Sequence, residues 1–253
     1  MLTWLPEVRE CVTAARKIAL FLDFDGTLVP ILADPDEVWL DAPTRDVLAR
    51  LACKNDIVTT IISGRAVDDL RMRVNVAGIV YAGNRGLEIS GRGLEFVEPV
   101  AAGRSAQLLD ITDLIASDLQ SIPGVSVEFK GLTSTVHYRR APERDVAGIQ
   151  AIVRAAVTPF AALFEVDGGK KALDIVPATG WHKGCAVSWI SERLGQDALH
   201  IYFGDDRTDE DAFGALPQAI TVRVGEGSES LAKYRVASHT DVGEFLEWLA
   251  LTK

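Results

Sequence analysis

The sequence predicts an α/β protein in which a doubly wound parallel sheet carries an inserted α+β domain. Short apolar runs alternate with stretches of helical periodicity towards both ends of the 253-residue chain. This alternation is typical of a parallel sheet covered by helices on both faces. In the middle of the chain the order changes to helix, strand, strand, and this order occurs twice. Such a repeat is typical of a small antiparallel sheet with its helices on one face.

The first part of the core is predicted to span residues 1–99. Residues 18–23 form an apolar run that leads into Asp-Phe-Asp-Gly, the pattern of a buried parallel strand followed by a turn. Helical periodicity follows over 43–54. Runs rich in β-branched residues over 56–62 and 79–82 predict two further strands of the same sheet.

The inserted domain is predicted to span residues 100–178, between linkers near Pro99 and near 177–180. Its expected elements are a helix, a hairpin, a second helix and a second pair of strands, over 102–120, 125–130 with 134–138, 143–156, and 164–167 with 172–176. We expect this domain to form a cap that is separate from the core.

The second part of the core is predicted over residues 179–253. It begins with a helix over 183–194 and a strand over 199–203, and continues with a helix over 209–216 and a strand over 219–224. Ligands of doubly wound sheets bind outside the carboxyl ends of the strands. Functional residues are therefore expected where these strands end.

Composition excludes several classes of partner. A net charge of −10 argues against binding to nucleic acid or to an anionic membrane, because both require a basic surface. No apolar run approaches the roughly 18 residues of a membrane helix, and the first residues do not resemble a signal peptide. We therefore expect a cytoplasmic monomer that acts on a small molecule. Its scattered cysteines, Cys11, Cys53 and Cys185, are expected to be buried free thiols.

Two carboxylates follow the first strand. Side chains alternate along an extended chain, so Asp23 and Asp25 are expected to project to the same side. Like charges about 4 Å apart repel by roughly 4 kcal/mol at an effective dielectric constant of 20, so either a cation binds or one group stays protonated. Both outcomes suit phosphoryl transfer. The alternative is an ordinary turn, because Asp-Gly is a common turn dipeptide.

A second acidic cluster, Gly-Asp-Asp-Arg-Thr-Asp-Glu-Asp over 204–211, follows the strand at 199–203. Oxygen ligands at the carboxyl end of a sheet are suited to Mg²⁺. We assign Asp205 and Asp206 to the site. The later acidic residues, Glu210 and Asp211 with Thr208 or Asp209, are expected to cap the next helix.

A phosphate group also requires hydrogen-bond donors. Ser63 ends its strand and offers a hydroxyl group, and Lys183 adds a positive charge at the start of a helix, where anions are favoured. Each residue alone is unremarkable. Asp-x-Asp, Ser, Lys and Asp-Asp in this order, each near a strand end or helix start, together indicate a phosphoryl-transfer site.

These four elements resemble the ordered signatures of the haloacid dehalogenase (HAD) superfamily. More narrowly, the sequence over about 18–250 resembles the trehalose-6-phosphate phosphatase family. The segments that carry this resemblance are Ser-Gly-Arg at 63–65, Gly-Asn-Arg-Gly-Leu-Glu at 83–88, Val-Glu-Phe-Lys at 127–130, His-Tyr-Arg at 137–139, Lys-Gly at 183–184 and the acidic segment at 204–210. Two positions depart from the family pattern: Arg85 replaces the usual His, and Asp174 stands where Glu is common.

The resemblance implies a magnesium-dependent phosphatase that forms an aspartyl-phosphate. Asp23 would be the nucleophile and Asp25 the acid and then the base. Mg²⁺ would be bound by the Asp23 carboxylate, the Asp25 backbone carbonyl and Asp205. Asp206 and Thr27 would support these ligands from behind, while Ser63 and Lys183 would hold the phosphate.

The resemblance also assigns sugar recognition to the cap, where Glu128, Lys130 and Asp174 match the family's glucose-contacting residues. Further candidates for substrate binding are Arg65, Arg85, Glu88, His137 and Arg139. For the residues on cap strands the alternative is a charged side chain that simply faces water. His137 is equally compatible with a packed, hydrogen-bonded histidine.

Three other functions remain open at this point. The first is a phosphatase of the same superfamily that acts on another sugar phosphate, such as sucrose phosphate or glucosylglycerol phosphate. The second is a phospho-accepting signalling module of the receiver type, which predicts a small domain without a cap and does not require Asp25. The third is a sugar-phosphate sensor that binds without catalysis.

Overall fold

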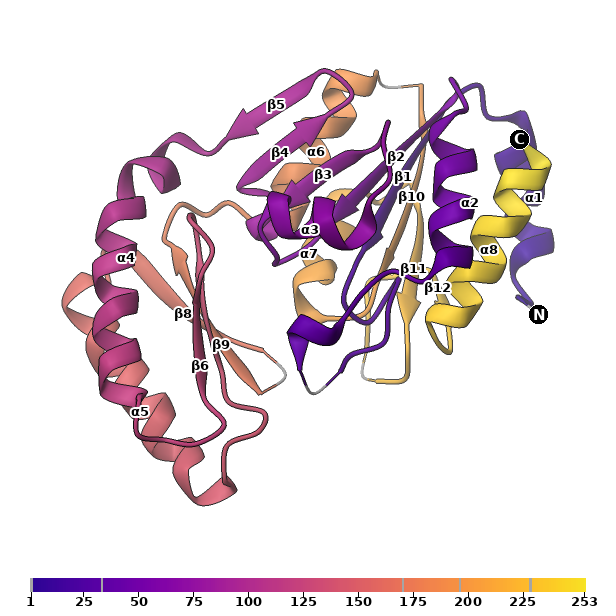
Figure 1. Cartoon of the computed structure of the whole chain (residues 1–253). Helices are drawn as coiled ribbons and strands as arrows, with labels where there is room; N and C mark the ends of the chain where they lie inside the picture. Colours follow the sequence, from indigo (N-terminus) through magenta and orange to yellow (C-terminus); the bar gives the residue numbers. More distant parts are fainter. Residues whose placement is uncertain (1, 33, 170, 196, 228) are drawn as a thin grey trace. The chain divides into compact units, whose positions relative to one another are not determined.

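The computed structural model describes residues 2–32, 34–169, 171–195, 197–227 and 229–253. The chain separates into two compact units (Figure 1). The larger comprises Met1–Phe96 with Trp181–Lys253, and the smaller comprises Val97–Gly180. Among the described residues, no helix combines the length and apolar character needed to cross a membrane.

The larger unit is built on a sheet with the strand order β12-β11-β10-β1-β2-β3-β4-β5. The strands are β1 Ile18–Asp23, β2 Ile57–Ile62, β3 Val80–Gly83, β4 Glu88–Gly91, β5 Leu94–Val97, β10 Leu199–Gly204, β11 Ile220–Val224 and β12 Tyr234–Val236. Pairing is parallel from β12 through to β3, and β4 adds to β3 in the antiparallel sense. The predicted α/β class is thus confirmed.

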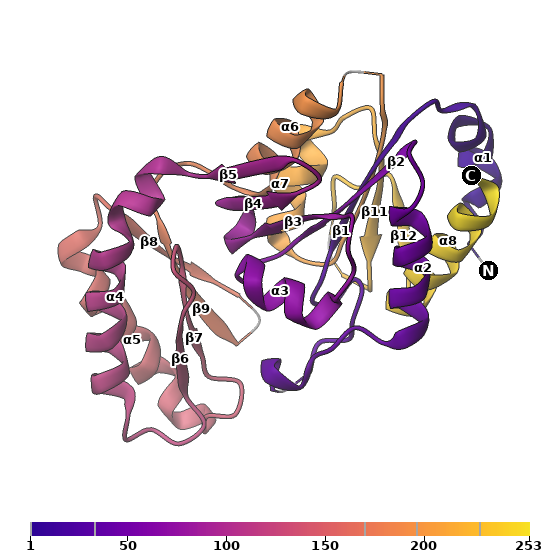
Figure 2. The same cartoon turned by 45° about the horizontal axis from the view of Figure 1, so that its top comes forward.

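Helices cover both faces of this sheet (Figures 1 and 2). They are α1 Leu5–Ala14, α2 Ala42–Ala52, α3 Val67–Val74, α6 Lys183–Leu194, α7 Arg207–Ala215 and α8 His239–Thr252. Side chains of β1 alternate between two cores. Leu20 and Leu22 pack in a cluster with residues of α1, α2, α3 and α8, and Phe21 packs in another with residues of α6 and α7. Odd-numbered positions of β1 therefore face α6 and α7.

The smaller unit is an antiparallel sheet with the strand order β6-β7-β9-β8 and two packed helices. Its elements are α4 Pro99–Leu119, β6 Ser126–Phe129, β7 Ser134–His137, α5 Val146–Val157, β8 Phe164–Gly168 and β9 Ala172–Pro177. Val136 and Leu173 of the sheet share an apolar core with Ile115 of α4 and Ile149 of α5. This is the predicted α+β arrangement.

Several element boundaries differ from the prediction for local reasons. The helix expected from residue 102 begins at Pro99, because the Glu98 side chain accepts the Ala101 N–H and proline is suited to the first helical turn. The helix expected from residue 209 begins at Arg207, because Asp206 is its N-cap. Short 3₁₀ turns lie at Pro35–Glu37, Asn84–Gly86, Glu143–Asp145 and Thr158–Phe160.

The cysteine prediction is wrong for two positions. Cys11 and Cys53 are exposed, and Cys185 is half-buried. Cys11 lies on α1, whose buried positions are Val8 and Val12, so its side chain falls outside the apolar stripe of that helix. Cys53 is the residue at which α2 ends.

Candidate active site

Three strand ends form the base of the site. β1 pairs in parallel with β2 on one side and β10 on the other, so the carboxyl ends of these strands are adjacent. Asp23 is the last residue of β1, Ser63 follows β2, and Asp205 follows β10. All three side chains are buried. The structure therefore brings together residues that the sequence assigns to one site.

Asp23 meets a lysine because of its position in the strand. As an odd-numbered residue of β1 it belongs to the face covered by α6 and α7. Lys183, the first residue of α6, donates from Nζ to Asp23 Oδ1 at 2.7 Å and to Asp209 Oδ1 at 2.8 Å. Lys183 is 3% exposed, so its ammonium group is held between two carboxylates with little access to water.

Asp209 belongs to the same cluster of side chains, although its sequence context indicates only a possible helix cap. It occupies the N3 position of α7 and completes a capping box with Asp206. Its Oδ1 also accepts a hydrogen bond from the Tyr202 hydroxyl at 2.8 Å, and its Oδ2 accepts the backbone N–H groups of Asp205 and Asp206 at 2.9 and 3.0 Å. The signal available in the sequence was an acidic residue one helical turn after Asp205.

The electrostatics of these groups are strongly coupled. Burial raises the pKa of Asp23 well above its usual range, and Asp209 and Asp205 raise it further, against the lowering effect of Lys183. For Lys183, burial alone would lower the pKa, but Asp209 and Asp23 raise it above its usual range. The lysine is therefore charged at neutral pH, and its single charge is shared among several acids.

The donor set fits a metal cation. Carboxylate oxygens of Asp23, Asp205 and Asp209 all lie within 4.8 Å of one another. Asp23 Oδ2 is buried and has no hydrogen-bond partner among the described residues. The expected ligand set was Asp23, Asp25 and Asp205, and the structure adds Asp209 to the carboxylates that lie together.

Two glycines make room for this cluster. A Cβ atom on Gly26 would lie 2.3 Å from Asp205 Oδ2, and Gly26 also has a φ of +96°. A Cβ atom on Gly204 would lie 2.2 Å from Asp209 Cγ. A side chain at either position would displace one of the carboxylates.

Asp206 and Thr27 lie around the cluster. Asp206 Oδ1 accepts the N–H and the hydroxyl group of Thr208, both at 2.7 Å. Burial acts to raise the pKa of Asp206, but Lys183 and the Thr208 hydrogen bonds outweigh it and lower the pKa to about 2. Thr27 is fully buried, and its hydroxyl oxygen has no hydrogen-bond partner among the described residues.

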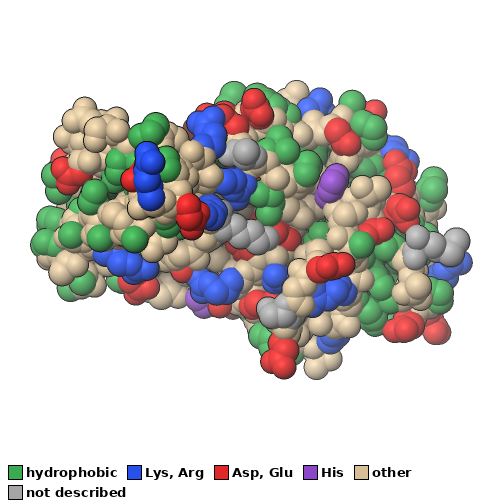
Figure 3. All heavy atoms as spheres, turned by 90° about the horizontal axis from the view of Figure 1, so that it is seen from below, with side chains coloured by type: hydrophobic (Ala, Val, Ile, Leu, Met, Phe, Trp, Pro, Cys, Tyr) green, Lys and Arg blue, Asp and Glu red, His purple; other side chains and the backbone are tan. Residues whose placement is uncertain are grey.

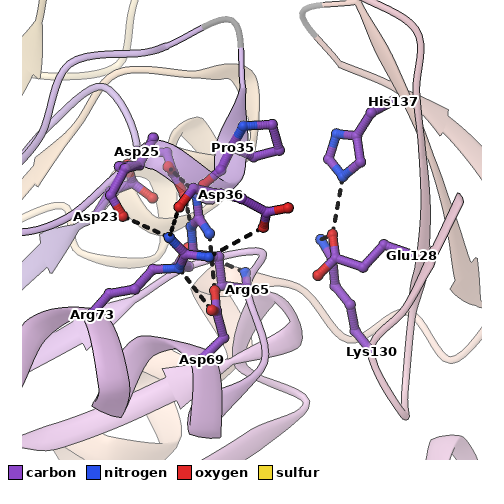
Figure 4. A network of polar contacts seen from close by, with 12 residues as sticks. Asp23, Asp25, Pro35, Asp36, Arg65, Asp69, Arg73, Glu128, Lys130 and His137 are labelled. Carbon is purple, nitrogen blue, oxygen red and sulfur yellow. Dashed lines mark hydrogen bonds and ion pairs between the residues drawn. The ribbon is translucent and has the colours of Figure 1, made fainter. Parts of the chain in front are cut away.

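Asp25 has a cation of its own. Arg65 donates from Nε to Asp25 Oδ2 at 2.7 Å and from Nη2 to Asp25 Oδ1 at 2.9 Å (Figure 4). The repulsion expected between Asp23 and Asp25 is thus offset by two separate cations, Lys183 and Arg65. The structure places Arg65, a candidate for substrate binding, on the carboxylate of Asp25.

The turn after β3 is held in an unusual backbone conformation. Asn84, Arg85 and Gly86 have φ values of +49°, +61° and +87°. The Arg85 N–H donates to the Ser63 carbonyl at 2.8 Å. Glu88 Oε1 accepts the Val67 N–H at 2.7 Å and Asn84 Nδ2 at 2.9 Å, so this carboxylate supports the turn.

Arg85 also acts on the acidic cluster. Its charge is one of the influences that lower the pKa of Asp206, after those of Lys183 and Thr208. Acidic and basic side chains are interspersed over the face shown in Figure 3. Within the cluster, Lys183 and Arg85 supply positive charge that acts on Asp206.

The candidates in the smaller unit share one face of its sheet. Glu128 pairs with Thr135, which pairs with Asp174, so their side chains point away from the apolar core under the helices. Glu128 Oε2 lies 3.0 Å from His137 Nε2 and 3.8 Å from Lys130 Nζ (Figure 4), and Thr135 donates to Asp174 Oδ1 at 2.6 Å.

Arg139 lies outside this row. It follows β7, which ends at His137, and its side chain is half-buried.

Comparison with known proteins identifies similar chains. Residues 21–240 match the family model for trehalose-phosphatases. The chain is 33% identical to the probable trehalose-phosphate phosphatase C of Arabidopsis thaliana, over 94% of this chain and 78% of that protein. A solved trehalose-6-phosphate phosphatase related protein superposes with a TM-score of 0.82 at 26% identity, covering 92% of this chain and 97% of that one.

A more distant structure shares the fold. A haloacid dehalogenase-like hydrolase from Bacteroides thetaiotaomicron superposes with a TM-score of 0.64 at 16% identity, over 92% of this chain and 99% of that chain.

Replacing Lys183 should lower the stability of the fold, because the buried carboxylates would lose their cation. In Lys183→Met the carboxylates of Asp23 and Asp209 lose their shared cation, so we expect the free energy of unfolding at pH 7 to fall by about 3–5 kcal/mol in buffer with a chelator. Both carboxyls already have raised pKa values in the folded protein. Protonation of these carboxyls should therefore stabilise the folded variant. The difference in unfolding free energy between the wild type and Lys183→Met should shrink as the pH falls from 7 towards about 4.

Lys17→Met is the matched control for denaturant unfolding. Lys17 Nζ donates to the Leu194 carbonyl at 2.7 Å, so its loss should cost about 1 kcal/mol, with little dependence on pH over the same range. Equal deficits in the two variants would contradict a special role for the Lys183 charge.

Proposed function

The chain belongs to the trehalose-phosphatase family, and on this premise we propose that it hydrolyses trehalose 6-phosphate to trehalose and phosphate through a phosphorylated Asp23. The observation that carries the mechanism is the state of the Asp23 carboxylate. One oxygen is fixed by Lys183, and the other is buried and accepts no hydrogen bond from the residues that the structure describes, beside the carboxylates of Asp205 and Asp209. A carboxylate held in this way is oriented for attack on an electrophile.

In the first step an Asp23 oxygen attacks phosphorus on the side opposite the sugar oxygen. The bond between phosphorus and the sugar oxygen breaks, and the departing oxygen takes the proton of Asp25. Asp25 lies two residues beyond the nucleophile, and its side chain is partly exposed, at 36%, so it can exchange protons with solvent. To act as the acid it must first take up a proton, which its ion pair with Arg65 opposes. The products of this step are trehalose and phosphorylated Asp23.

In the second step a water molecule attacks the phosphorus of phosphorylated Asp23. Asp25, now ionised, accepts the proton of that water while the bond between Asp23 and phosphorus breaks. Phosphate leaves, and both aspartates return to their starting states. The ion pair of Asp25 with Arg65 matches the ionised form that this step requires.

We propose that Lys183 and Ser63 hold the transferring phosphoryl group. Lys183 neutralises part of the negative charge that a phosphate dianion would bring to Asp23. Ser63 lies at the end of β2, next to β1, and its hydroxyl already accepts the Arg65 N–H at 3.2 Å. The hydroxyl proton is thus available to a phosphate oxygen.

Asp23 and Asp205, with the backbone carbonyl of Asp25, are the groups that would hold Mg²⁺. Asp209, whose two oxygens each accept two hydrogen bonds, would instead fix Lys183 and the loop beside them. When bound there, the ion would supply positive charge against the phosphate oxygens and the carboxylates. Asp206 would keep the loop between β10 and α7 in place as the N-cap of α7.

We propose that residues 97–180 form the cap that selects the sugar. Their sheet carries Glu128, Lys130 and Asp174 on the face opposite its helices, and hydroxyl-rich ligands are recognised by such charged donors and acceptors. The phosphoryl-transfer residues all lie in the other unit. The two tasks are therefore separable by mutation. The Glu88 carboxylate accepts hydrogen bonds from the Val67 N–H and Asn84 Nδ2. Glu88 would therefore contribute by stabilising the turn that contains Arg85.

Phosphate release from a panel of sugar phosphates tests the function. With Mg²⁺, kcat/KM for trehalose 6-phosphate should exceed that for sucrose phosphate and glucosylglycerol phosphate by at least about 10-fold, a difference of about 1.4 kcal/mol in transition-state binding. A chelator, or Asp23→Asn, should abolish release from every substrate. Faster phosphate release from another sugar phosphate would identify that compound as the preferred substrate. Tight binding of a sugar phosphate without phosphate release would instead support a sensor.

Variants of the smaller unit test the division of tasks. Replacing Glu128, Lys130 or Asp174 with Ala should lower kcat/KM for trehalose 6-phosphate by about 10- to 100-fold, or about 1.4–2.7 kcal/mol, the scale of one or two charge-assisted hydrogen bonds. Turnover of 4-nitrophenyl phosphate, which has no sugar, should hardly change.

Glu143→Ala is the control for these variants, because Glu143 is 80% exposed and its ion pair with Lys171 lies at the surface. It should leave both substrates unaffected. A parallel loss on both substrates in the Glu128, Lys130 or Asp174 variants would mean that these residues support folding or the chemical step.

A further inference from the structure

We infer that Arg65 is a positioning residue for Asp25, and that Asp69 and Arg73 hold Arg65 in that position. The inference rests on the proposed role of Asp25 as acid and base. It extends beyond the residues proposed to react, because the side-chain hydrogen bonds of Asp69 and Arg73 within the described part of the chain go to Arg65, to each other and to the loop at 36–38, and not to Asp23 or the acidic cluster. The residues form one continuous chain of ion pairs in the larger unit (Figure 4).

The guanidinium group of Arg65 is occupied on all three nitrogens. Nε and Nη2 bind the two oxygens of Asp25, Nη2 also donates to the Pro35 carbonyl at 3.0 Å, and Nη1 donates to Asp69 Oδ2 at 2.9 Å. Its side chain is 10% exposed, and the group lies over the Phe24 ring at 5.6 Å. This fork geometry fixes the plane of the Asp25 carboxylate as well as its position.

Asp69 joins two arginines. Its Oδ2 accepts Arg65 Nη1, and its Oδ1 accepts Arg73 Nε at 2.7 Å. The three residues are spaced four apart, Asp69 and Arg73 lie on α3, and Arg65 lies just before that helix, so they follow one face of it. Each charge is flanked by one of opposite sign, from Asp25 through to Arg73.

Arg73 connects the chain of ion pairs to the loop that follows β1. Its Nη1 donates to the carbonyls of Val38 at 2.7 Å and Asp36 at 3.1 Å, and its side chain is 6% exposed. Pro35, which accepts from Arg65, belongs to the same loop. Both arginines thus bind loop carbonyls as well as Asp69.

Burying such a network of charges does not by itself stabilise the fold. Removing two guanidinium groups and a carboxylate from water is expensive, and apolar residues of similar volume often stabilise a fold as well or better. A rigid support explains the arrangement instead. Asp25 must face the leaving sugar oxygen in one step and the attacking water in the next, and a small misplacement of such a group slows proton transfer.

The test compares two substrates that have no sugar and differ little in shape. Phenyl phosphate requires a proton on its leaving oxygen, whereas 4-nitrophenyl phosphate has a more acidic leaving group and needs it far less. In Asp69→Asn we expect kcat/KM to fall at least about 10-fold for phenyl phosphate and less than about 3-fold for 4-nitrophenyl phosphate. Because kcat/KM covers only the steps up to the first irreversible one, the second step does not contribute.

Asp68→Asn is the matched control. Asp68 is the neighbour of Asp69 on α3, its side chain is 98% exposed, and it forms an ion pair with Arg71 at 3.7 Å. It should leave both substrates unaffected. If Asp69→Asn does not fold, Arg65→Lys serves as a second variant, because it keeps the charge but loses the two-pronged contact, and the same selective loss is expected. Equal losses on both substrates, or none, would overturn the inference.

A measurement without catalysis separates this inference from the proposed function. In ¹⁵N spectra of the intact protein, the Nε–H signals of Arg65 and Arg73 should exchange slowly with water, and Asp69→Asn should accelerate both at least about 10-fold while Asp68→Asn leaves them unchanged. Fast exchange of both signals in the wild type would overturn the chain of ion pairs. If the protein hydrolysed no sugar phosphate, the proposed substrate would be wrong. The positioning role of Arg65 would still be tested, because the aryl phosphates and the spectra do not depend on that substrate.

Discussion

The shared ammonium group of Lys183 is the interaction on which the site depends. Burying carboxylates together at the end of a parallel sheet is unfavourable unless a fixed cation offsets their repulsion. Lys183 supplies it by binding Asp23 and Asp209 at once. This requires α6 to begin beside the end of β1 and α7 to begin beside the end of β10. The packing of both helices on one face of the sheet, through Phe21, Ile190 and Phe213, meets that requirement.

Much of the fold follows from patterns that the sequence displays. The buried strands β1, β2 and β10 are continuous apolar runs, and α6 spans the residues expected for it. Other elements were not identified, namely α1, α3, β4, β5, β12 and α8. Most of these are short or half-exposed, whereas α8 carries a regular apolar stripe, Val242, Phe245, Leu246 and Leu249, so the sequence did contain its signal. In α1, for example, only Val8 and Val12 are buried, so tertiary packing rather than periodicity decides that helix.

The candidate site, like the fold, was predicted from the sequence only in part. Asp23, Ser63, Lys183 and Asp205 were predicted to lie together because each stands next to a strand end or helix start, and the structure brings them together. Asp209 was missed because an acidic residue in the first turn of a helix usually has a capping role, which it also has here. The contact of Arg65 with Asp25 joins residues 40 positions apart, and no local pattern indicates which cation a carboxylate will meet.

Trapping the reaction intermediate is the most direct test of the central claim that Asp23 is the nucleophile. Wild-type protein mixed with trehalose 6-phosphate and Mg²⁺, and stopped by acid within milliseconds, should yield a peptide that contains Asp23 and carries one phosphoryl group by mass spectrometry. Hydroxylamine should remove that group, as it removes other acyl phosphates. Phosphoryl transfer to another residue, or rapid turnover with no phosphorylated peptide at any time, would contradict the account.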